Sequence, residues 1–486
     1  MRCVTLLTRT PSPKSQRPGA SPGEVLTIVC AGVVLASLDL FIVNVALPQI
    51  ARELHAPDLG ELSWVLNAYA IVYASLLVFF GRLADRYRRD RAFLIGIAVF
   101  TAASAACAAA TSVGMLIGFR VLQAAGAALL TPTSLGLVLA SYAPERRHGA
   151  VRAWTAMGGL AAAIGPVVGG LLVAASWRWV FLVNVPIGIA AMVFGWRRLP
   201  AIAGHPVARP DAAGVVLAIA GIGLLTFGLV KGPDWGWASS RVESLLGTAV
   251  IVLVAFAWHC VHSRSPLIDP TLFRSREFTV ASLIAVFFSA AFGAMLLSIV
   301  LWEQGAWGWS ALRAGLAIAP GPVMVPVMSF LAAGPLIRRY GAAAVIIAGS
   351  FAFAAGRMWW ALSITASPNY LTGVLGGMLL GGVGVGLVLP TMMGTATASL
   401  PAHAFATGSG VINMIRQTGL ALGVAVLVAV LGAGAHHASS LAAFEKAWWL
   451  TAALGFAGII PALALAQRQR SAITAPGSLA PVLEES

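Results

Sequence analysis

The stretch GRLADRYRRDRAF, residues 81–93, places five arginines and two aspartates in thirteen positions. It stands between long runs of Ala, Leu, Val, Ile and Phe that carry almost no charge. A similar stretch, GPLIRRYG (334–341), follows another apolar run, 253 residues after GRLADRYR (81–88). Two related charged connections in an apolar chain predict that the chain consists of two similar halves.

The composition is that of a membrane protein. Of the 486 residues, 59% are hydrophobic and only 10% are charged, whereas soluble domains carry about 25% charged residues. Apolar runs of about 20 residues can cross a bilayer core of roughly 30 Å. We predict fourteen spans, at approximately 25–47, 62–80, 92–112, 114–139, 149–174, 179–196, 213–230, 243–262, 278–301, 311–333, 343–365, 370–398, 405–432 and 445–466.

The net charge of +14 is explained by membrane topology, and we expect no nucleic-acid partner. If the N-terminus is cytoplasmic, 22 of the 31 Lys and Arg residues fall on the cytoplasmic side, six fall outside and three fall within spans. This asymmetry follows the positive-inside rule, and an even number of spans returns the C-terminus to the cytoplasm. We therefore expect a multi-pass protein of the bacterial cytoplasmic membrane, in contact with anionic lipid, with both termini cytoplasmic.

The internal repeat predicts the organisation of the chain. GAALLTPTS (126–134) aligns with GVGLVLPTM (384–392), which places Gly126 opposite Gly384 and Pro132 opposite Pro390, 258 residues apart. Paired halves of this kind flank a central cavity and rock around it. The predicted units are a disordered cytoplasmic tail (1–24), an N-terminal six-helix bundle (25–196), a linker with two extra transmembrane helices (197–277), a C-terminal six-helix bundle (278–466) and a cytoplasmic tail (467–486).

Six motifs in order along the chain carry a family resemblance. They are LDLFIVNVALPQI (38–50), GRLADRYR (81–88), GFRVLQAAGAALLTPTS (118–134), GGLAAAIGPVVGGLL (158–172), SWRWVFLVNVPIG (176–188) and INMIRQTGLALGVAV (412–426). The chain resembles the major facilitator superfamily, and within it the fourteen-helix drug:proton antiporters of the EmrB/QacA type. This resemblance implies the major-facilitator fold and export driven by protons. Phe41 stands where the first of these motifs frequently has Thr, so the wall near Asp39 is expected to be more apolar.

Asp39 and Arg120 are the candidate residues for proton coupling. Asp39 is the one carboxylate well inside the predicted spans, since Glu303 lies near the outer end of the ninth span. An intramembrane acid is costly and is therefore expected to be functional. Burial favours its neutral form and a nearby cation favours its charged form, so the site could load and release a proton. Arg120 in the fourth span can hold Asp39 and then release it, although a permanent structural brace between the two helices is the alternative.

Two motifs are candidates for gating. In the charged loop, Gly81, Asp85, Arg86 and Arg89 form the motif, and we predict that Asp85 accepts charge-assisted contacts that latch the cytoplasmic side. The alternative is a solvated turn that only fixes orientation. In the fifth span, small residues near i, i+4 spacing let backbones approach, and a proline weakens the helix ladder. The helix-5 motif residues are Gly165, Pro166, Gly169 and Gly170.

Polar residues in apolar helices are candidates for lining the cavity, with hydrogen bonding between helices as the alternative. These candidates are Asn44, Asn67, Gln123, Asn413, Arg416 and Gln417. Arg357, in the eleventh span, has no assigned role. The four cysteines show no CxxC or Cys/His ligand spacing, and we expect no metal site.

The predicted function is proton-coupled efflux of an amphiphilic small molecule by alternating access. The energy source is the proton gradient; no cofactor is expected, and the chain has no GxxxxGK[ST] phosphate loop. An alternative is a dedicated exporter of an endogenous product such as an antibiotic or a siderophore. A receptor-like relative that no longer transports would be favoured by a long soluble signalling extension, and a membrane enzyme would need a convergent catalytic constellation. We expect neither, and the sequence does not predict the oligomeric state.

Overall fold

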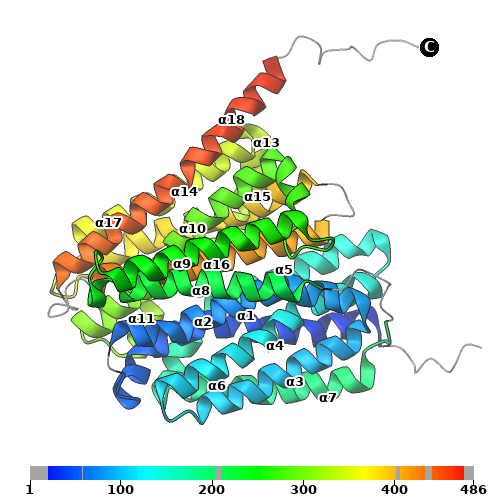
Figure 1. Cartoon of the computed structure of the whole chain (residues 1–486), viewed down its shortest axis with the longest axis horizontal. Helices are drawn as coiled ribbons and strands as arrows, with labels where there is room; N and C mark the ends of the chain where they lie inside the picture. The colour runs from blue at the N-terminus through cyan, green and yellow to red at the C-terminus, as the bar shows by residue number, and fades with distance from the viewer. Residues whose placement is uncertain (1–19, 57, 203–209, 401–404, 433–439, 475–486) are drawn as a thin grey trace, which may run out of the picture.

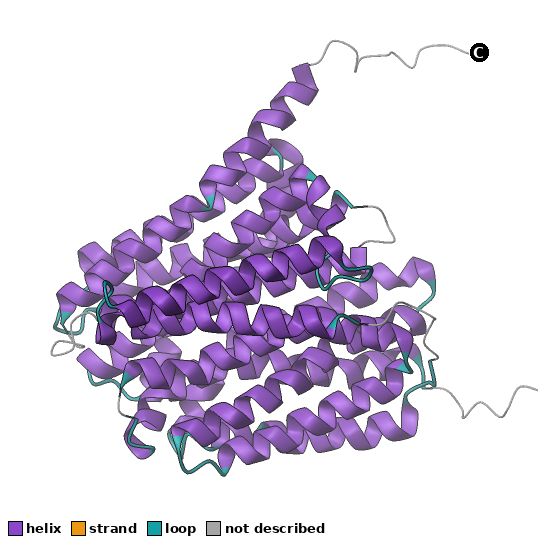
Figure 2. Cartoon of the chain, viewed as in Figure 1, coloured by secondary structure: helices purple, strands orange, loops and turns teal. Residues whose placement is uncertain are grey.

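The computed structural model describes residues 20–56, 58–202, 210–400, 405–432 and 440–474, which are helical and contain no strand (Figure 2). Twelve of the described helices are long and apolar enough to cross a membrane, and one bent helix pair raises this number to as many as thirteen. The predicted all-α membrane fold is confirmed, whereas the count of fourteen spans is not. The predicted span at 311–333 contains a shorter apolar helix, Ala311–Val327, followed by a π-helix.

The N-terminal helices pack around α1 and α4. The elements are α1 (Pro22–Glu53), α2 (Leu59–Arg86), α3 (Arg89–Ala108), α4 (Val113–Ser141), α5 (Pro144–Val173), α6 (Trp179–Leu182) and α7 (Asn184–Arg198). α1 contacts α4, α5 and α7, and α4 contacts α2 and α3. In Figure 1 these blue and cyan helices occupy the lower part of the molecule.

The C-terminal helices pack around α10, α14 and α15, and most of them lie in the upper part of Figure 1, with α11 lower at the left beside α2. The elements are α10 (Arg276–Leu301), the π-helix η2 (Trp302–Ala306), α11 (Ala311–Ile318), α12 (Pro320–Val327), the π-helix η3 (Met328–Ala333), α13 (Gly334–Tyr340), α14 (Ala342–Ser363), the π-helix η4 (Tyr370–Leu375), α15 (Gly376–Ala398), α16 (Phe405–Gly432), α17 (Leu441–Ala457) and α18 (Ile459–Thr474). In the chain, the two sets of helices are connected by α8 (Ala212–Trp235), α9 (Ser240–His262) and the short 3₁₀-helix η1 (Pro270–Arg274).

Both predicted tails are partly helical where the structure describes them. α1 begins at Pro22 because Ser21 and Glu24 form a capping box, in which each side chain accepts a hydrogen bond from the other residue's backbone amide. The predicted tail 1–24 is therefore helical from Pro22, and residues 1–19 lie outside the described part. α18 continues to Thr474 into the predicted tail 467–486, of which residues 475–486 lie outside the described part.

The two halves use the same glycine contact between equivalent helices. Between α3 and α4, a Cβ added to Gly126 would lie 2.6 Å from the backbone nitrogen of Phe100. Between α14 and α15, a Cβ added to Gly384 would lie 2.9 Å from the backbone nitrogen of Phe353. The offsets between these pairs, 258 and 253 residues, are those of the sequence repeat. The repeat is therefore also a repeat of backbone packing, which only glycine permits at these two positions.

The two halves meet along α2 and α16, and again where α5 contacts α11. The second contact lies near the loops that connect α1 to α2 and α10 to α11, and we name this region the α1–α2 end. There the Nε2 of Gln304 donates a hydrogen bond to the carbonyl of Val45, with a distance of 3.0 Å. The opposite region, where α2 is followed by α3, is named the α2–α3 end.

The α8–α9 hairpin is anchored to α2 at both of its ends. In Figure 1 the two green helices cross the front of the molecule, and α8 contacts both α2 and α16. At the α1–α2 end, the Nζ of Lys231 lies 3.0 Å from the Oδ2 of Asp58. At the α2–α3 end, the Nη1 of Arg82 donates to the carbonyl of Ser265 with a distance of 3.1 Å. The hairpin therefore covers the line along which the halves meet and is fixed to the N-terminal side.

The loop ends of the hairpin are held by Asp211. This carboxylate accepts hydrogen bonds from the backbone amides of Gly214 and Leu267, at 2.8 and 2.9 Å, and contacts His259 Nε2 at 2.9 Å. Burial alone would raise the pKa of Asp211, but the amide bonds and His259 together hold this pKa below its usual range. The charged form of Asp211 therefore stabilises the folded hairpin.

We expect Asp211→Asn to weaken attachment of the hairpin by about 1–3 kcal/mol at neutral pH, because a buried charged acceptor is lost. Thermal unfolding in detergent, followed by tryptophan fluorescence, measures the difference from the wild type. Because the pKa of Asp211 is lower in the folded state than in the unfolded state, its stabilising contribution is complete above about pH 4. This contribution disappears as the pH falls through the folded-state pKa. The difference in unfolding temperature between the wild type and the variant should therefore disappear at acidic pH. Glu243→Gln, at an exposed position of α9, is the control, and an equal loss there would contradict the assignment.

Candidate functional site

Asp39 and Arg120 form a buried ion pair between α1 and α4. Both side chains are fully buried, and the Nη1 of Arg120 donates to the Oδ2 of Asp39. The Nε of Arg120 donates to the carbonyl of Val65 on α2, with a distance of 3.2 Å. Three helices of the N-terminal half therefore meet at this guanidinium. The two candidate coupling residues are in direct contact, and their role in proton transfer stays a prediction.

Three neutral side chains complete the cluster around Asp39. The Nε2 of Gln123 donates to the Oδ1 of Asp39 and to the hydroxyl of Ser104, both at 2.8 Å. The Oε1 of Gln123 accepts from the Nη1 of Arg120 at 2.8 Å. From α7, the Nδ2 of Asn184 donates to the Oδ1 of Asp39 at 3.3 Å. The carboxylate is thus held by one cation and two amides, which fixes its position.

Arg120 also has unused hydrogen-bonding capacity. Its Nη2 is buried without a hydrogen-bond partner, and its Cζ lies 4.0 Å from the centroid of the Tyr69 ring. The hydroxyl of Tyr69 is itself buried without a partner. A guanidinium held on one side by a carboxylate and on the other by an aromatic face can keep its charge when the carboxylate is neutralised.

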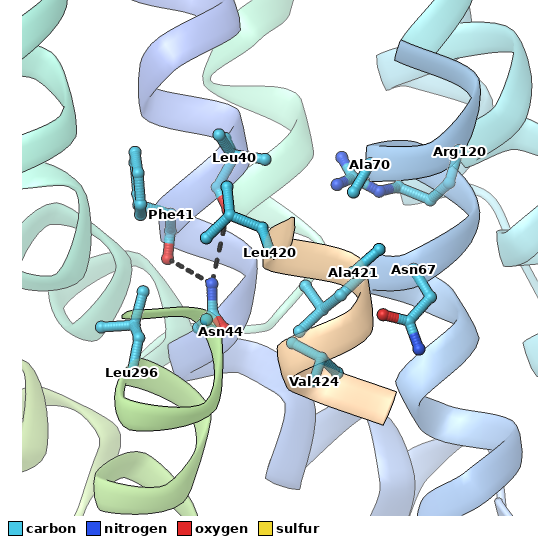
Figure 3. A pocket seen from close by; sticks show the side chains of 12 residues that line it. Leu40, Phe41, Asn44, Asn67, Ala70, Arg120, Leu296, Leu420, Ala421 and Val424 are labelled. Carbon is cyan, nitrogen blue, oxygen red and sulfur yellow. Dashed lines mark hydrogen bonds between the residues drawn. The ribbon is translucent and has the colours of Figure 1, made fainter. Parts of the chain in front are cut away.

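A small cavity between the two halves adjoins the ion pair. It has a volume of about 40 Å³, which is room for about two or three water molecules. Figure 3 shows lining side chains from α1, α2 and α4 of the N-terminal half together with side chains from α10 and α16 of the C-terminal half. The lining residues are Leu40, Phe41, Asn44, Leu66, Asn67, Ala70, Arg120, Gly293, Leu296, Leu420, Ala421 and Val424. Pockets for drug-sized molecules measure about 300–1,000 Å³, so the halves are nearly closed on each other here.

Of the predicted cavity residues, Asn44 and Asn67 line the cavity (Figure 3). The amide of Asn44 donates to the carbonyls of Leu40 and Phe41 of its own helix, and the Oδ1 of Asn67 is buried without a partner. Phe41 packs on Phe292 of α10, at 6.0 Å between ring centroids. The wall of the cavity is therefore mostly apolar, with an unpaired acceptor in it.

The other predicted cavity residues lie outside this lining. Gln123 faces Asp39 within the N-terminal half, as described above. The polar group on α16 lies before Leu420, the first α16 residue of the lining. In that group Asn413 donates to the carbonyl of Ser409 at 3.0 Å, Arg416 interacts electrostatically with Tyr73, and the Oε1 of Gln417 is buried without a partner.

The glycines of α5 serve two different contacts. A Cβ on Gly165 would lie 3.2 Å from the Cβ of Phe41, and a Cβ on Gly169 would lie 3.0 Å from the carbonyl of Ile42, both on α1. Gly170 and Pro166 instead approach the other half, because a Cβ on Gly170 would lie 2.7 Å from the carbonyl of Ala311. α5 also bends by 41° between Ala162 and Ile164, close to its internal proline, a usual cause of such bends. Small residues thus let α5 touch α1 and α11 at once.

Described side chains of the charged loop contact Asp90 within the loop and the hairpin connection outside it. Arg88 pairs with Asp90, with Nη2 to Oδ2 at 2.6 Å, and Arg82 bonds to the hairpin connection. Arg89 begins α3, and its backbone amide donates to the carbonyl of Ile202 at 3.2 Å. Gly81 and Arg86 lie in the last two turns of α2. The side chain of Asp85 lies outside the described residues, so its predicted latch stays a prediction.

Arg357 is buried on α14 at the repeat equivalent of Ser104, 253 residues later. Its guanidinium lies 3.7 Å from the centroid of the Trp360 ring and bonds to the carbonyl of Gly377. A Cβ on Gly381, the repeat equivalent of Gln123, would lie 2.7 Å from the Nη2 of Arg357. The C-terminal half therefore buries a cation where the N-terminal half buries a hydroxyl and an amide. Nothing in the structure explains a transport role for this cation.

Sequence reasoning missed Ser104 and Asn184 as members of the cluster. Ser104 is a single small polar residue in an apolar helix, a pattern too common to be informative. Asn184 stands in the quoted motif SWRWVFLVNVPIG (176–188), which was a usable signal for its position beside Asp39.

Comparison with known proteins agrees with this fold. The profile described as Major Facilitator Superfamily matches residues 29–424. The cephamycin export protein CmcT of Amycolatopsis lactamdurans is 35% identical over 417 residues, covering 84% of this chain and 85% of that protein. The multidrug resistance protein Stp of Mycobacterium tuberculosis is 34% identical over 417 residues, covering 84% and 76%. A solved bacterial homologue of the human drug peptide transporters PepT1 and PepT2 aligns with a TM-score of 0.62 and 13% identity, covering 93% of this chain and all of that one. This chain therefore belongs to the Major Facilitator Superfamily.

Proposed function

We propose that this protein is a proton-coupled antiporter that exports amphiphilic small molecules by alternating access. The observation that carries this proposal is the buried pair of Asp39 and Arg120, whose arginine also lines the cavity between the halves. A family of transporters and relatives named for export and resistance support a transporter rather than an enzyme. The proton gradient is the energy source in this proposal, and no cofactor takes part.

In the coupling step, a proton and Arg120 compete for the carboxylate of Asp39. When the carboxylate binds a proton, it loses its charge attraction to Arg120, while Gln123 and Asn184 can still hydrogen-bond to the neutral acid. The guanidinium remains charged and is then free to interact with the cavity. One proton moving down a potential of about 150 mV supplies roughly 3.5 kcal/mol, at about 2.3 kcal/mol per 100 mV. At about 1.4 kcal/mol for each tenfold ratio of concentrations, this energy supports an outward substrate gradient of a few hundredfold.

The orientation follows from the charge asymmetry of the sequence. We place the α2–α3 end and both termini in the cytoplasm of a bacterial inner membrane, because the basic residues concentrate on that side. The fourteen-helix EmrB/QacA type is the branch that the motifs favour. In this branch α8 and α9 are the two extra helices, and Ala311–Val327 with the following π-helix is the shortest span.

The cavity favours neutral, weakly cationic or anionic amphiphiles over dications. Its wall is apolar, and its charged member is an arginine. The similarity to CmcT supports export of an antibiotic made by the host, and the similarity to Stp supports resistance to several drugs. Deletion of the gene separates the two: a dedicated exporter changes release of a host product, whereas a multidrug exporter changes sensitivity to added compounds.

The coupling proposal predicts that Asp39→Asn abolishes substrate-triggered proton release. Inverted vesicles with an acidic interior and a dye that reports internal pH receive a panel of neutral, anionic and monocationic amphiphiles. We expect the wild type to release protons with at least one compound, and a well-folded Asp39→Asn to release none, because asparagine cannot exchange a proton. Glu243→Gln, an exposed carboxyl on α9, serves as control and should behave as the wild type. Proton release that persists in Asp39→Asn would remove Asp39 from the mechanism.

A further inference from the structure

A second buried acid, Glu303, lies far along the chain from Asp39, at the α1–α2 end. It is the second residue of η2, the π-helix between α10 and α11. Glu303 is fully buried, and both of its carboxyl oxygens lack a hydrogen-bond partner. π-helical turns occur mostly within helices and often at functional sites. The π-turn and the unpartnered acid coincide here.

The residue before Glu303 in the chain, Trp302, belongs to a buried aromatic cluster. The neighbouring Trp302 packs on Phe444 and Trp448 of α17, with ring centroids at 5.1 and 5.8 Å. The backbone amide of Trp309 donates to the carbonyl of Glu303 at 2.9 Å and leaves the carboxyl group untouched. An ionised carboxylate in such a site would be both unsolvated and unpaired, which costs several kcal/mol at least. The neutral carboxyl is the form that this conformation can hold.

No cation in the described residues balances Glu303. Tyr370 of η4 interacts with it electrostatically, but its hydroxyl donates to the carbonyl of Ala317 at 3.0 Å. Arg313 of α11 stacks on the Trp309 ring, with its Cζ at 4.1 Å from the centroid. On the facing α1, Arg52 lies in the wall of an outer cavity that Glu303 does not line. On α17, the charged neighbours of its aromatic contacts are Glu445 and Lys446, and neither forms an ion pair with Glu303.

A proton is the ligand that fits this site, and a cavity lies beside the same turn of the chain. The lining of the outer cavity, of about 590 Å³, includes Gln304, Gly305, Gly308 and Trp309, all within six residues after Glu303. Gly308 adopts a positive φ of 63°, a conformation that glycine reaches without strain. In the proposal below, a shift of this glycine-containing turn brings water from the cavity to the carboxyl group.

The same turn joins the two halves. The side chain of Gln304 donates to the carbonyl of Val45 on α1, and α11 follows the turn and packs on α5. Exposing Glu303 to water therefore requires moving the segment that holds the α1–α2 end closed. Charge on Glu303 and closure of this end exclude each other.

We propose that Glu303 is a second proton-binding site and that its protonation keeps the α1–α2 end of the molecule closed. The step is a proton transfer between water in the outer cavity and a carboxylate oxygen. In the antiport cycle proposed above, this proton would bind from the outside as that end closes. The role in transport rests on the proposed function, whereas the link between protonation and closure does not.

The test measures opening of the α1–α2 end as a function of pH. Spin labels are placed on cysteines introduced at His55 and Ala366, exposed positions on the two halves at this end, in a background without native cysteines. Distances are measured by pulsed electron resonance in lipid nanodiscs from about pH 5 to about pH 9, a range in which a buried carboxyl can titrate. We expect a longer distance to become populated in the wild type as the pH rises, and Glu303→Gln to keep the short distance throughout.

Two further variants make the outcome decisive. Asp39→Asn should keep the pH-dependent opening while losing proton release, which separates this proposal from the coupling proposal. Glu303→Leu, which also lacks a titratable group, should stay closed like Glu303→Gln if the glutamine variant folds poorly. Infrared spectroscopy should show a protonated carboxyl band at neutral pH that is missing in Glu303→Gln. The proposal is wrong if that band is absent from the wild type, or if opening follows pH equally in Glu303→Gln.

Discussion

Arg120→Met is expected to lower the free energy of unfolding by about 3–5 kcal/mol, the usual cost of removing one partner of a buried ion pair, and to abolish transport. The variant leaves Asp39 buried with two amides but no cation. It also removes the hydrogen bonds that Arg120 donates to the carbonyl of Val65 and to the Oε1 of Gln123. Because an unpaired carboxyl is tolerated inside the membrane only when neutral, the loss should be largest at high pH and shrink as the pH falls.

The double variant Asp39→Asn with Arg120→Met distinguishes a coupling pair from a structural brace. Replacing both partners of a buried pair by neutral side chains is often nearly neutral for stability. We therefore expect the double variant to unfold near the wild-type temperature while its proton release stays absent. Arg241→Met, an exposed arginine at the start of α9, is the control for loss of a surface charge. Recovery of transport in the double variant would show that the pair is a brace and that coupling lies elsewhere.

Sequence could predict those features of the fold that depend on residues rarely found in apolar spans or on recognisable repeated stretches. A carboxylate and an arginine inside apolar spans are costly, so Asp39 and Arg120 were conspicuous, and the structure places them in contact. The repeat of Gly126 and Gly384 was visible because both stand in recognisable stretches, and the same backbone contact recurs in both halves. Ser104 has no such signal, since small polar side chains satisfy themselves on their own helix at little cost.

Other features of the structure were not predictable from the sequence, although local chemistry explains them once the structure is known. The predicted span 311–333 is divided among α11, α12 and η3, because Pro320, Pro322 and Pro326 lack the amide that continues a helix ladder. In the charged loop, sequence alone could not assign partners among five arginines and two aspartates, and Arg88 takes the nearer acid, Asp90. Glu303 looked like a residue at a span end, because its burial in the π-turn between α10 and α11 is a property of the fold.

The second large effect is expected from Gly315→Leu, which overpacks the contact between α5 and α11 and should favour the open state of the α1–α2 end. A Cβ on Gly315 would lie 2.4 Å from the carbonyl of Pro166, a backbone atom that no change of side-chain rotamer can move away. Overpacking costs about 1–3 kcal/mol. Here the molecule can relieve that cost by separating the halves, which should shift the closed-to-open equilibrium of the α1–α2 end by about 5–150-fold. We expect the distance between labels at His55 and Ala366 to be long at every pH.

Transport should be lost in Gly315→Leu, because alternating access requires the closed state at this end. Gly170→Leu, which would meet the carbonyl of Ala311 from the opposite side of the contact, should reproduce both effects. Gly247→Leu on α9, where a Cβ meets nothing within 4 Å, is the matched control and should change neither the distance nor transport. If Gly315→Leu instead lowered stability while the short distance persisted, the contact would be fixed packing and not an interface that separates during transport. A long distance in both interface variants, with normal behaviour in the control, would identify α5 and α11 as the surfaces that part when this end opens.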